Sequence, residues 1–196
     1  MRIVLATSNQ GKVKEFQSWI TEYPVVAYTD LLEPFEIEEN GTTFKENALI
    51  KARAVYEKLS PTTDIILSDD SGISIPILGG IPGIYSARYA GKEASAKENL
   101  DKLIRTLKEH HIERTPAFYT AAIALVGAKG EFCVHGWMHG EALAKAKGTN
   151  GFGYDPMFIP AGYTQTLGEL DESVKKSFSH RAKALELARI ILNSLK

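Results

Sequence analysis

Two neighbouring aspartates, Asp69 and Asp70, follow an apolar run in the segment IILSDDSG, residues 65–72. Adjacent residues of a strand point to opposite faces, so we expect the two carboxylates to have different roles. An apolar strand predicts burial, and burying a carboxylate is costly unless a positive group accompanies it. The pattern therefore predicts that a strand ends at the aspartates, beside a positive charge.

A second acidic segment, FEIEENG, contains Glu36, Glu38 and Glu39. Carboxylate oxygens from two loops, completed by phosphate oxygens, are the usual way in which proteins hold Mg²⁺. The two acidic segments together therefore predict a Mg²⁺ site. From the residues alone, the choice of direct ligands stays open, and the alternative for the glutamates is a solvated acidic loop.

The segment LATSNQGKVKEF takes an apolar strand through a polar, glycine-containing turn into a helix. Such a turn points backbone N–H groups at an anion. Lys12 lies at the start of this helix, where a cation opposes the helix dipole unless a negative group is bound nearby. The spacing does not fit the longer glycine loop of a Walker motif. The segment predicts a phosphate contact, and an ordinary strand-to-helix connection is the alternative.

The last predicted helix, like the one that begins near Lys12, has positively charged side chains at its N-terminus. Ser179 is a plausible N-cap, and His180 and Arg181 occupy the first turn, where the helix end is already positive. Lys175 and Lys176 lie just upstream. These groups would suit a bound anion or a base oxygen. The alternative is a solvated basic turn.

Aromatic side chains occur among glycines in GTNGFGYDPMF, where Phe152 and Tyr154 precede Asp155 and Pro156. An aromatic ring on a loop can stack on a nucleobase, which contributes about 1–3 kcal/mol per base. The alternative is that these rings pack in the core beside a turn.

Predicted strands and helices, which would position these residues, alternate in the first part of the chain. The spacing of apolar residues predicts both helices and strands, and it predicts a β-rich segment in the second half of the chain. The predicted helices cover 13–23, 43–59, 95–109 and 179–196, and the predicted strands lie at 2–6, 64–67 and within 72–78, with two long strands in 117–144 joined by a turn at Lys129-Gly130. This order predicts one α/β domain, 1–196, with a mixed sheet flanked by helices.

Composition limits the class of protein. The chain has 196 residues, is 44% hydrophobic and has a formal net charge of −1, which argues against binding to nucleic acid polymers or membrane surfaces. The single cysteine, Cys133, cannot form an internal disulfide, which suits a reducing cytoplasm. No segment approaches the roughly 20 apolar residues of a membrane span. We therefore expect a soluble, cytoplasmic protein.

Six segments in series resemble the inosine triphosphate pyrophosphatases, also described as pyrophosphatases for non-standard purine nucleoside triphosphates. They are ATSNQGKVKE, EENGTTFKENALIKA, SDDSG, GGIPGIYSARYAG, GTNGFGYDP and SHRAKAL, in the family's order and at its spacing. The resemblance covers nearly the whole chain. It implies a homodimer of two-lobed subunits, each built on a long mixed β-sheet flanked by helices, with the active-site cleft between the lobes.

The resemblance also implies an activity: Mg²⁺-dependent hydrolysis of ITP, dITP and XTP to the monophosphate and pyrophosphate, which clears deaminated purines from the nucleotide pool. It implies Glu39 and Asp70 as the Mg²⁺ ligands, with Asp70 also the proton acceptor and Asp69 its catalytic neighbour. The residues that would bind the phosphates are Thr7, Ser8, Asn9, Gln10, Gly11, Lys12 and Lys51.

The same resemblance implies a base and substrate pocket. Its residues would be Phe152, Gly153, Tyr154, Asp155, Lys175, His180 and Arg181, while Ser71, also a substrate-binding residue, would lie beside the Mg²⁺ ligands. Two other classes of protein stay open: an enzyme of the same fold that acts on a different nucleotide or phosphate bond, and a nucleotide-binding protein without turnover.

Overall fold

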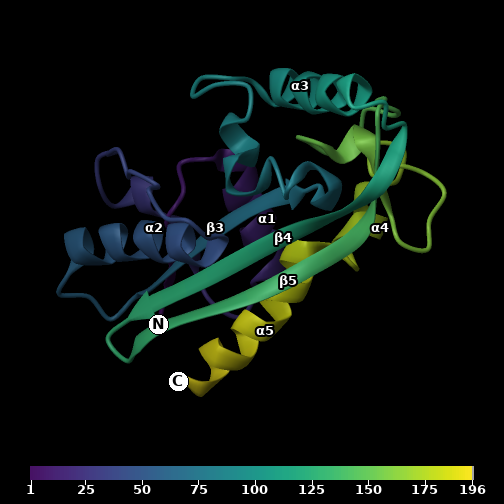
Figure 1. Ribbon diagram of the computed structural model, residues 1–196. Helices are drawn as coiled ribbons and strands as arrows, with labels where there is room; N and C mark the ends of the chain where they lie inside the picture. Colours follow the sequence, from purple (N-terminus) through teal and green to yellow (C-terminus); the bar gives the residue numbers. More distant parts are fainter. Residues whose placement is uncertain (196) are drawn as a thin grey trace. The chain divides into compact units, whose positions relative to one another are not determined.

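The computed structural model describes residues 1–195, and its six strands form one mixed sheet in the order β2-β1-β3-β4-β5-β6 (Figure 1). The strands are β1 (Ile3–Leu5), β2 (Val25–Ala27), β3 (Ile65–Ser74), β4 (Arg114–Gly127), β5 (Gly130–Leu143) and β6 (Phe158–Pro160). β1 pairs in parallel with β2 and β3, whereas β6 is antiparallel to β5. The predicted mixed sheet is confirmed, although β2 and β6 had no sequence signal.

Five α-helices accompany the sheet in the described part of the chain. They are α1 (Gln10–Trp19), α2 (Phe44–Leu59), α3 (Ala96–Glu109), α4 (Glu172–Lys176) and α5 (His180–Ser194). Short 3₁₀ helices cover Tyr28–Asp30, Pro76–Leu78, Gly83–Arg88 and Asp155–Met157. Within the described residues, no helix is both long and apolar enough to cross a membrane.

Side-chain caps explain where the helices begin. The Asn9 side chain accepts hydrogen bonds from the backbone N–H of Gly11 (2.9 Å) and Lys12 (3.1 Å), so α1 begins three residues before the predicted start at 13 and ends at Trp19 instead of 23. Ser95 caps α3 in a capping box. Ser179 caps α5 as predicted. The predicted last residue of this helix, 196, lies outside the described residues.

The chain forms two compact units. Unit 1 contains residues 1–70, 122–135 and those described after 183, and unit 2 contains 71–121 and 136–183. In unit 1, buried residues of α2, among them Ala48 and Ala52, pack against Ile66 of β3 and Ala124 of β4. Ala48 and Ala52 are four residues apart and therefore lie on one face of α2, which is the face that packs against the sheet.

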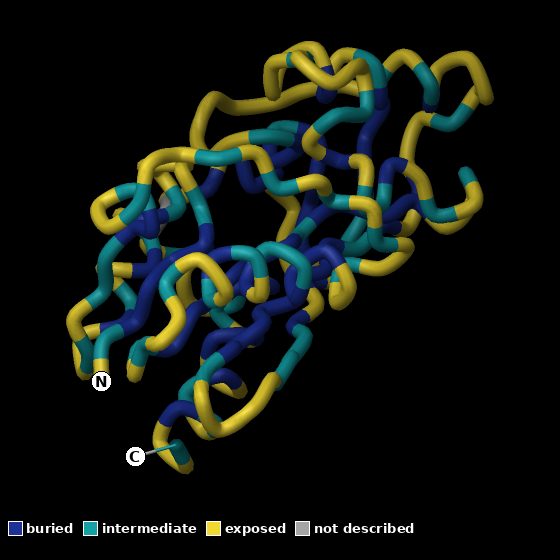
Figure 2. Tube along the Cα trace, turned by 90° about the vertical axis from the view of Figure 1, so that its left-hand side faces the viewer, coloured by how far each residue is buried: buried dark blue, intermediate teal, exposed yellow. Residues whose placement is uncertain are grey.

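The core of unit 2 lies between α3 and the sheet. Leu103 and Leu107 of α3 pack with Ile73 of β3, Met138 of β5 and Phe158 of β6. In Figure 2 the buried residues follow the strands and the inward helix faces, while the exposed ones lie mainly in the loops. Each unit therefore has its own hydrophobic core, supplied partly by strands that run through both units.

One expectation about the strands is wrong. The strand that begins at Ile65 does not end at Asp69 and Asp70 but continues as β3 to Ser74, so the two predicted strands are one. Beyond the aspartates, Gly72 allows close packing, because a Cβ there would lie 2.4 Å from the Gly83 carbonyl oxygen and the Ser86 Oγ. The carboxylates are tolerated inside the strand because each has a lysine partner.

Candidate active site

The two aspartates of β3 contact different lysines within unit 1. The Lys12 ammonium of α1 lies 2.8 Å from Asp69 Oδ2, and the Lys51 ammonium of α2 lies 2.9 Å from Asp70 Oδ1. Lys51 Nζ also lies 3.3 Å from Glu39 Oε2. The two aspartates thus have different lysine partners. Glu39 and Asp70 share one ammonium group and are therefore close neighbours.

Burial changes the proton affinity of these groups. Burial raises the pKa of Asp70, and the nearby charges of Glu39 and Asp69 add to the rise despite the opposing effect of Lys51. Burial alone would lower the pKa of Lys51, but the charges of Asp70 and Glu39 outweigh it and raise that pKa. A carboxylate with a raised pKa is a better proton acceptor than an ordinary aspartate. The arrangement can therefore hold a permanent cation beside a general base.

The segment from Thr7 to Lys12 forms the turn into α1. Asn9 uses its side-chain oxygen as the helix cap, and its backbone N–H donates to Thr7 Oγ1 at 3.2 Å. Ser8, Asn9, Gln10 and Gly11 are exposed. The turn thus presents accessible polar groups at a helix N-terminus, as the sequence predicted.

The predicted base residues lie in unit 2 around one buried carboxylate. Asp155 Oδ2 accepts the Phe152 backbone N–H at 3.0 Å and pairs with the buried Lys175 ammonium. Lys175 Nζ lies 4.7 Å from the centroid of the Phe152 ring. Gly153 has φ = 61°, a left-handed conformation that favours glycine. Despite these contacts, Phe152 is 55% exposed.

Arg181 approaches the same ring from the first turn of α5. Its guanidinium carbon lies 5.1 Å from the Phe152 ring centroid, and Nη2 donates to Ser71 Oγ at 2.9 Å. Lys175, His180 and Arg181 are all buried, which does not fit a solvated basic turn. The structure thus brings together four of the residues predicted for the base pocket, Phe152, Asp155, Lys175 and Arg181, and adds Ser71 as a contact of Arg181.

Tyr154 has a different environment from its neighbour Phe152. It is buried, and its hydroxyl donates to the Ser86 carbonyl at 2.7 Å. Burial raises the pKa of Tyr154, so the hydroxyl stays protonated. The hydrogen bond ties the GFGYDP loop to the 3₁₀ helix of residues 83–88.

Sequence reasoning missed Tyr119 of β4. This buried tyrosine donates to Asp155 Oδ1 at 3.3 Å and stacks on the His180 ring with centroids 4.8 Å apart. The signal was a tyrosine hydroxyl in the largely apolar strand segment AFYTAAIAL, where a buried hydroxyl requires a partner. Of the acidic segment, Glu36 and Glu38 are exposed, whereas Glu39 is half-buried.

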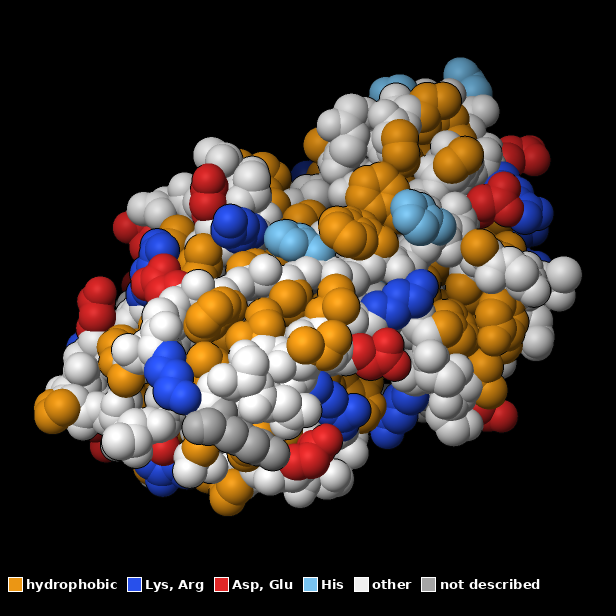
Figure 3. Space-filling view, turned by 90° about the horizontal axis from the view of Figure 1, so that it is seen from below, with side chains coloured by type: hydrophobic (Ala, Val, Ile, Leu, Met, Phe, Trp, Pro, Cys, Tyr) orange, Lys and Arg blue, Asp and Glu red, His pale blue; other side chains and the backbone are white. Residues whose placement is uncertain are grey.

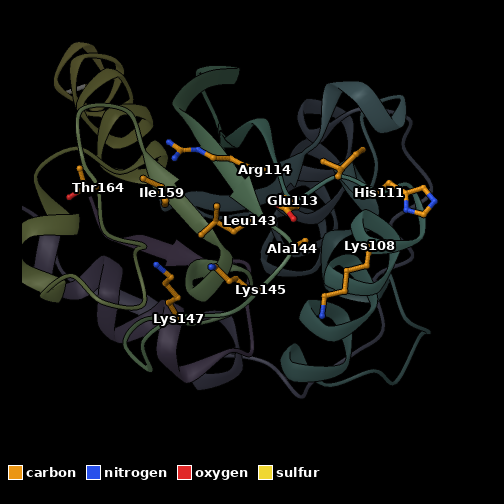
Figure 4. A pocket seen from close by; sticks show the side chains of 11 residues that line it. Lys108, His111, Glu113, Arg114, Leu143, Ala144, Lys145, Lys147, Ile159 and Thr164 are labelled. Atoms are coloured by element: carbon orange, nitrogen blue, oxygen red, sulfur yellow. The ribbon is translucent and has the colours of Figure 1, made fainter.

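A separate pocket of about 810 Å³ lies in unit 2 and contains none of the predicted site residues (Figure 4). Its lining includes five basic side chains and one acidic residue, Glu113. The basic residues are Lys108, His111, Arg114, Lys145 and Lys147. All five are exposed. They are therefore well solvated, unlike the buried cations around Asp155.

The sequence of this chain is similar to that of known proteins over nearly its whole length. A model of the Ham1 family matches residues 3–190. The chain belongs to the Ham1 family. A dITP/XTP pyrophosphatase of Nautilia profundicola is 60% identical to this family member over 195 residues, covering 100% of this chain and 99% of that protein. The dITP/XTP pyrophosphatase of Sulfurimonas denitrificans is 58% identical over 199 residues, covering 100% of both chains.

Solved structures of Ham1 proteins have the same fold. The structure of the Staphylococcus aureus Ham1 protein superimposes with a TM-score of 0.88 at 36% sequence identity, and the match covers 100% of both chains. The resemblance and the fold class inferred from the sequence are therefore confirmed for this Ham1 family member. The roles of its individual side chains remain predictions.

Proposed function

We propose that this protein hydrolyses non-standard purine nucleoside triphosphates, ITP, dITP and XTP, to a nucleoside monophosphate and pyrophosphate. Full-length relatives named dITP/XTP pyrophosphatase support this class of reaction. The observation that carries the proposal is the buried Asp70 beside Lys51 and Glu39, which combines a base with a cation for a charged substrate.

The reaction is a displacement at the α-phosphorus. Asp70 accepts a proton from the attacking water, whose oxygen forms the new bond to phosphorus while the bond to the pyrophosphate oxygen breaks. Lys12 and Lys51 hold negative charge that grows on the departing pyrophosphate. The exposed turn at residues 7–12 offers polar groups for the phosphate chain.

Mg²⁺ is the proposed cofactor, and the residues present fit it. Asp70 Oδ2 is buried and has no hydrogen-bond partner among the described residues, so one carboxylate oxygen is available as a ligand. Glu39 would be the second protein ligand. No group of three or more ligand-type side chains occurs in the described chain, so triphosphate oxygens and water would complete the coordination, as is usual for Mg²⁺. When bound, the ion would neutralise charge on the triphosphate.

Unit 2 supplies the proposed base recognition. Inosine and xanthine present an acceptor oxygen at purine position 6, where adenine presents an amino donor. Arg181 has only donors and His180 can donate as well, so these side chains favour the oxygen. The exposed Phe152 ring would stack on the purine.

The cellular setting is part of the same proposal. Removing deaminated purines before polymerases use them would take place in the cytoplasm, and the enzyme would act as a homodimer. Large exposed hydrophobic side chains, which often mark an interface, occur in the segment around Ile77, Ile81 and Tyr85. Figure 3 shows hydrophobic side chains interspersed with charged ones on one face of the molecule.

A panel of nucleoside triphosphates tests the proposal. With Mg²⁺ present, dITP and XTP should yield monophosphate and pyrophosphate much faster than dATP does, and a chelator should stop the reaction. Release of orthophosphate alone would indicate an enzyme that cleaves a different bond. Binding without any release would indicate a nucleotide-binding protein. The Lys145→Met variant is a control, since Lys145 lines only the separate pocket.

A further inference from the structure

Tyr119 connects two of the proposed base-recognition residues. It lies on β4 in unit 2, is only 7% exposed, and reaches Asp155 through its hydroxyl and His180 through its ring. The hydroxyl oxygen lies 3.3 Å from Asp155 Oδ1. The two rings are nearly parallel, at 14°, with centroids 4.8 Å apart.

The Asp155 carboxylate is held from both sides. Oδ2 accepts the Phe152 backbone N–H and pairs with Lys175, whereas Oδ1 accepts the Tyr119 hydroxyl. A carboxylate with a donor on each oxygen cannot rotate without losing a hydrogen bond. Tyr119 therefore fixes the orientation of the group that anchors both the Phe152 backbone and the Lys175 ammonium.

The Tyr119 ring is itself firmly placed. It packs edge-on against Phe158 of β6, with ring centroids 4.9 Å apart and an angle of 68°. Burial and the charge of Asp155 raise the pKa of Tyr119 well above its ordinary value, so the hydroxyl remains a donor at physiological pH. The His180 ring thus rests on a rigid platform at the start of α5.

A purely space-filling role would not require this geometry. A phenylalanine would fill the same volume, yet this chain has a tyrosine whose hydroxyl is directed at a buried, charged carboxylate. The Tyr119 hydroxyl thus contacts Asp155, and the Tyr119 ring contacts His180.

We propose that Tyr119 is a positioning residue that sets the preference for purines with an oxygen at position 6. This inference rests on the proposed function and adds a residue to the same site. The ring orients His180 toward the base oxygen, and the hydroxyl holds Asp155 and, through it, the Phe152 loop and Lys175.

Two variants separate these contributions. Tyr119→Phe keeps the ring but removes the hydroxyl, so we expect the KM for dITP to rise about fivefold while kcat changes less than about twofold. Tyr119→Leu removes the ring as well, and the ratio of kcat/KM for dITP to that for dATP should fall about tenfold. Restoration of this ratio by phenylalanine would identify the ring as the orienting group.

A spectroscopic measurement reports the stacking directly. In the full-length protein, the ring proton signals of His180 should show the ring-current shift of a stacked partner in the wild type and in Tyr119→Phe, but not in Tyr119→Leu. Tyr89→Phe is the matched control, because it also removes a half-buried tyrosine hydroxyl bond in unit 2, to Thr106, away from Asp155. It should leave the dITP to dATP ratio and the His180 signals unchanged.

The outcomes are decisive. If Tyr119→Leu keeps the dITP to dATP ratio although the His180 signals move, the positioning role is wrong. If Tyr119→Leu does not fold, an unchanged KM for dITP in Tyr119→Phe overturns the inference. If the wild type does not hydrolyse dITP, the proposed function fails separately, and the binding preference for IMP over AMP, measured by calorimetry, still tests Tyr119.

Discussion

At β3, two carboxylates lie next to each other in the sequence and are nevertheless both buried, at 7% and 8% exposure for Asp69 and Asp70. Repulsion between them is reduced because they contact different lysines from different helices. Lys51 additionally holds Glu39, so one ammonium group stabilises two carboxylates. Single-residue changes here alter the charge balance of the whole cluster.

Replacing Asp70 by asparagine removes the proposed proton acceptor without changing the size of the side chain. We expect kcat for dITP to fall at least about a hundredfold, the lower end for the loss of a general base. Asp101→Asn, which breaks an exposed ion pair with Lys97, is the control and should leave kcat unchanged. Near-normal turnover of Asp70→Asn would transfer the role to Asp69 or Glu38.

Replacing Arg181 by alanine tests base recognition. We expect kcat/KM for ITP to fall at least about tenfold more than kcat/KM for ATP, because the proposed donor to the position 6 oxygen is lost. The exposed Arg105 of α3 provides the control variant Arg105→Ala. Equal losses for ITP and ATP would mean that Arg181 binds phosphate instead.

At the scale of elements, β3 carries chemistry along its length: Asp69 and Asp70 belong to unit 1, and Ser71, which accepts from Arg181, begins unit 2. The strand then packs tightly on the 3₁₀ helix of residues 83–88. The Ser86 Oγ accepts the Ile73 backbone N–H at 3.0 Å and donates to the Gly83 carbonyl at 2.6 Å. A defect in this packing should therefore affect both stability and base binding.

Gly72→Ala should show this effect. A Cβ at Gly72 would lie 2.4 Å from both the Gly83 carbonyl oxygen and the Ser86 Oγ, so we expect destabilisation by about 1–3 kcal/mol, as for other overpacked sites. Gly127→Ala in β4 is the matched control, because its Cβ would meet atoms no nearer than 3.6 Å. Denaturant unfolding of both variants measures the difference. Equal free energies of unfolding would show that the 3₁₀ helix moves away at little cost.

Two features of the whole molecule favour self-association. They are the near-neutral net charge of −1 and several large exposed hydrophobic side chains. Ile77, Ile81 and Tyr85 are all exposed within a short segment of unit 2. A near-neutral protein with such a segment has little electrostatic barrier to self-association.

We expect sedimentation to give twice the chain mass of 21.6 kDa. Ile77→Glu should shift the protein toward monomer, because a charge in an apolar interface loses its hydration. Ile190→Glu on α5 is the control, since Ile190 and Ile77 are equally exposed at 66%. Dissociation by Ile190→Glu alone would place the interface on α5.

Features that depend on local interactions could be predicted from the sequence. The starts of α3 and α5 follow from Ser95 and Ser179, because a cap bonds to backbone groups only three residues away. The β4–β5 hairpin follows from apolar runs on both sides of Lys129-Gly130. The motifs in series were sufficient to indicate the family, and full-length relatives confirm it.

The contacts of Asp69, Asp70 and Tyr119 could not be predicted, because their partners are distant in the sequence. β3 continues past Asp69 and Asp70 because Lys12 and Lys51 reach it from two separate helices, and no local pattern encodes that meeting. The partner of the Tyr119 hydroxyl lies 36 residues away in the chain. The energy of a buried charge or hydroxyl depends on its neighbours in space, which periodicity and spacing along the sequence do not specify.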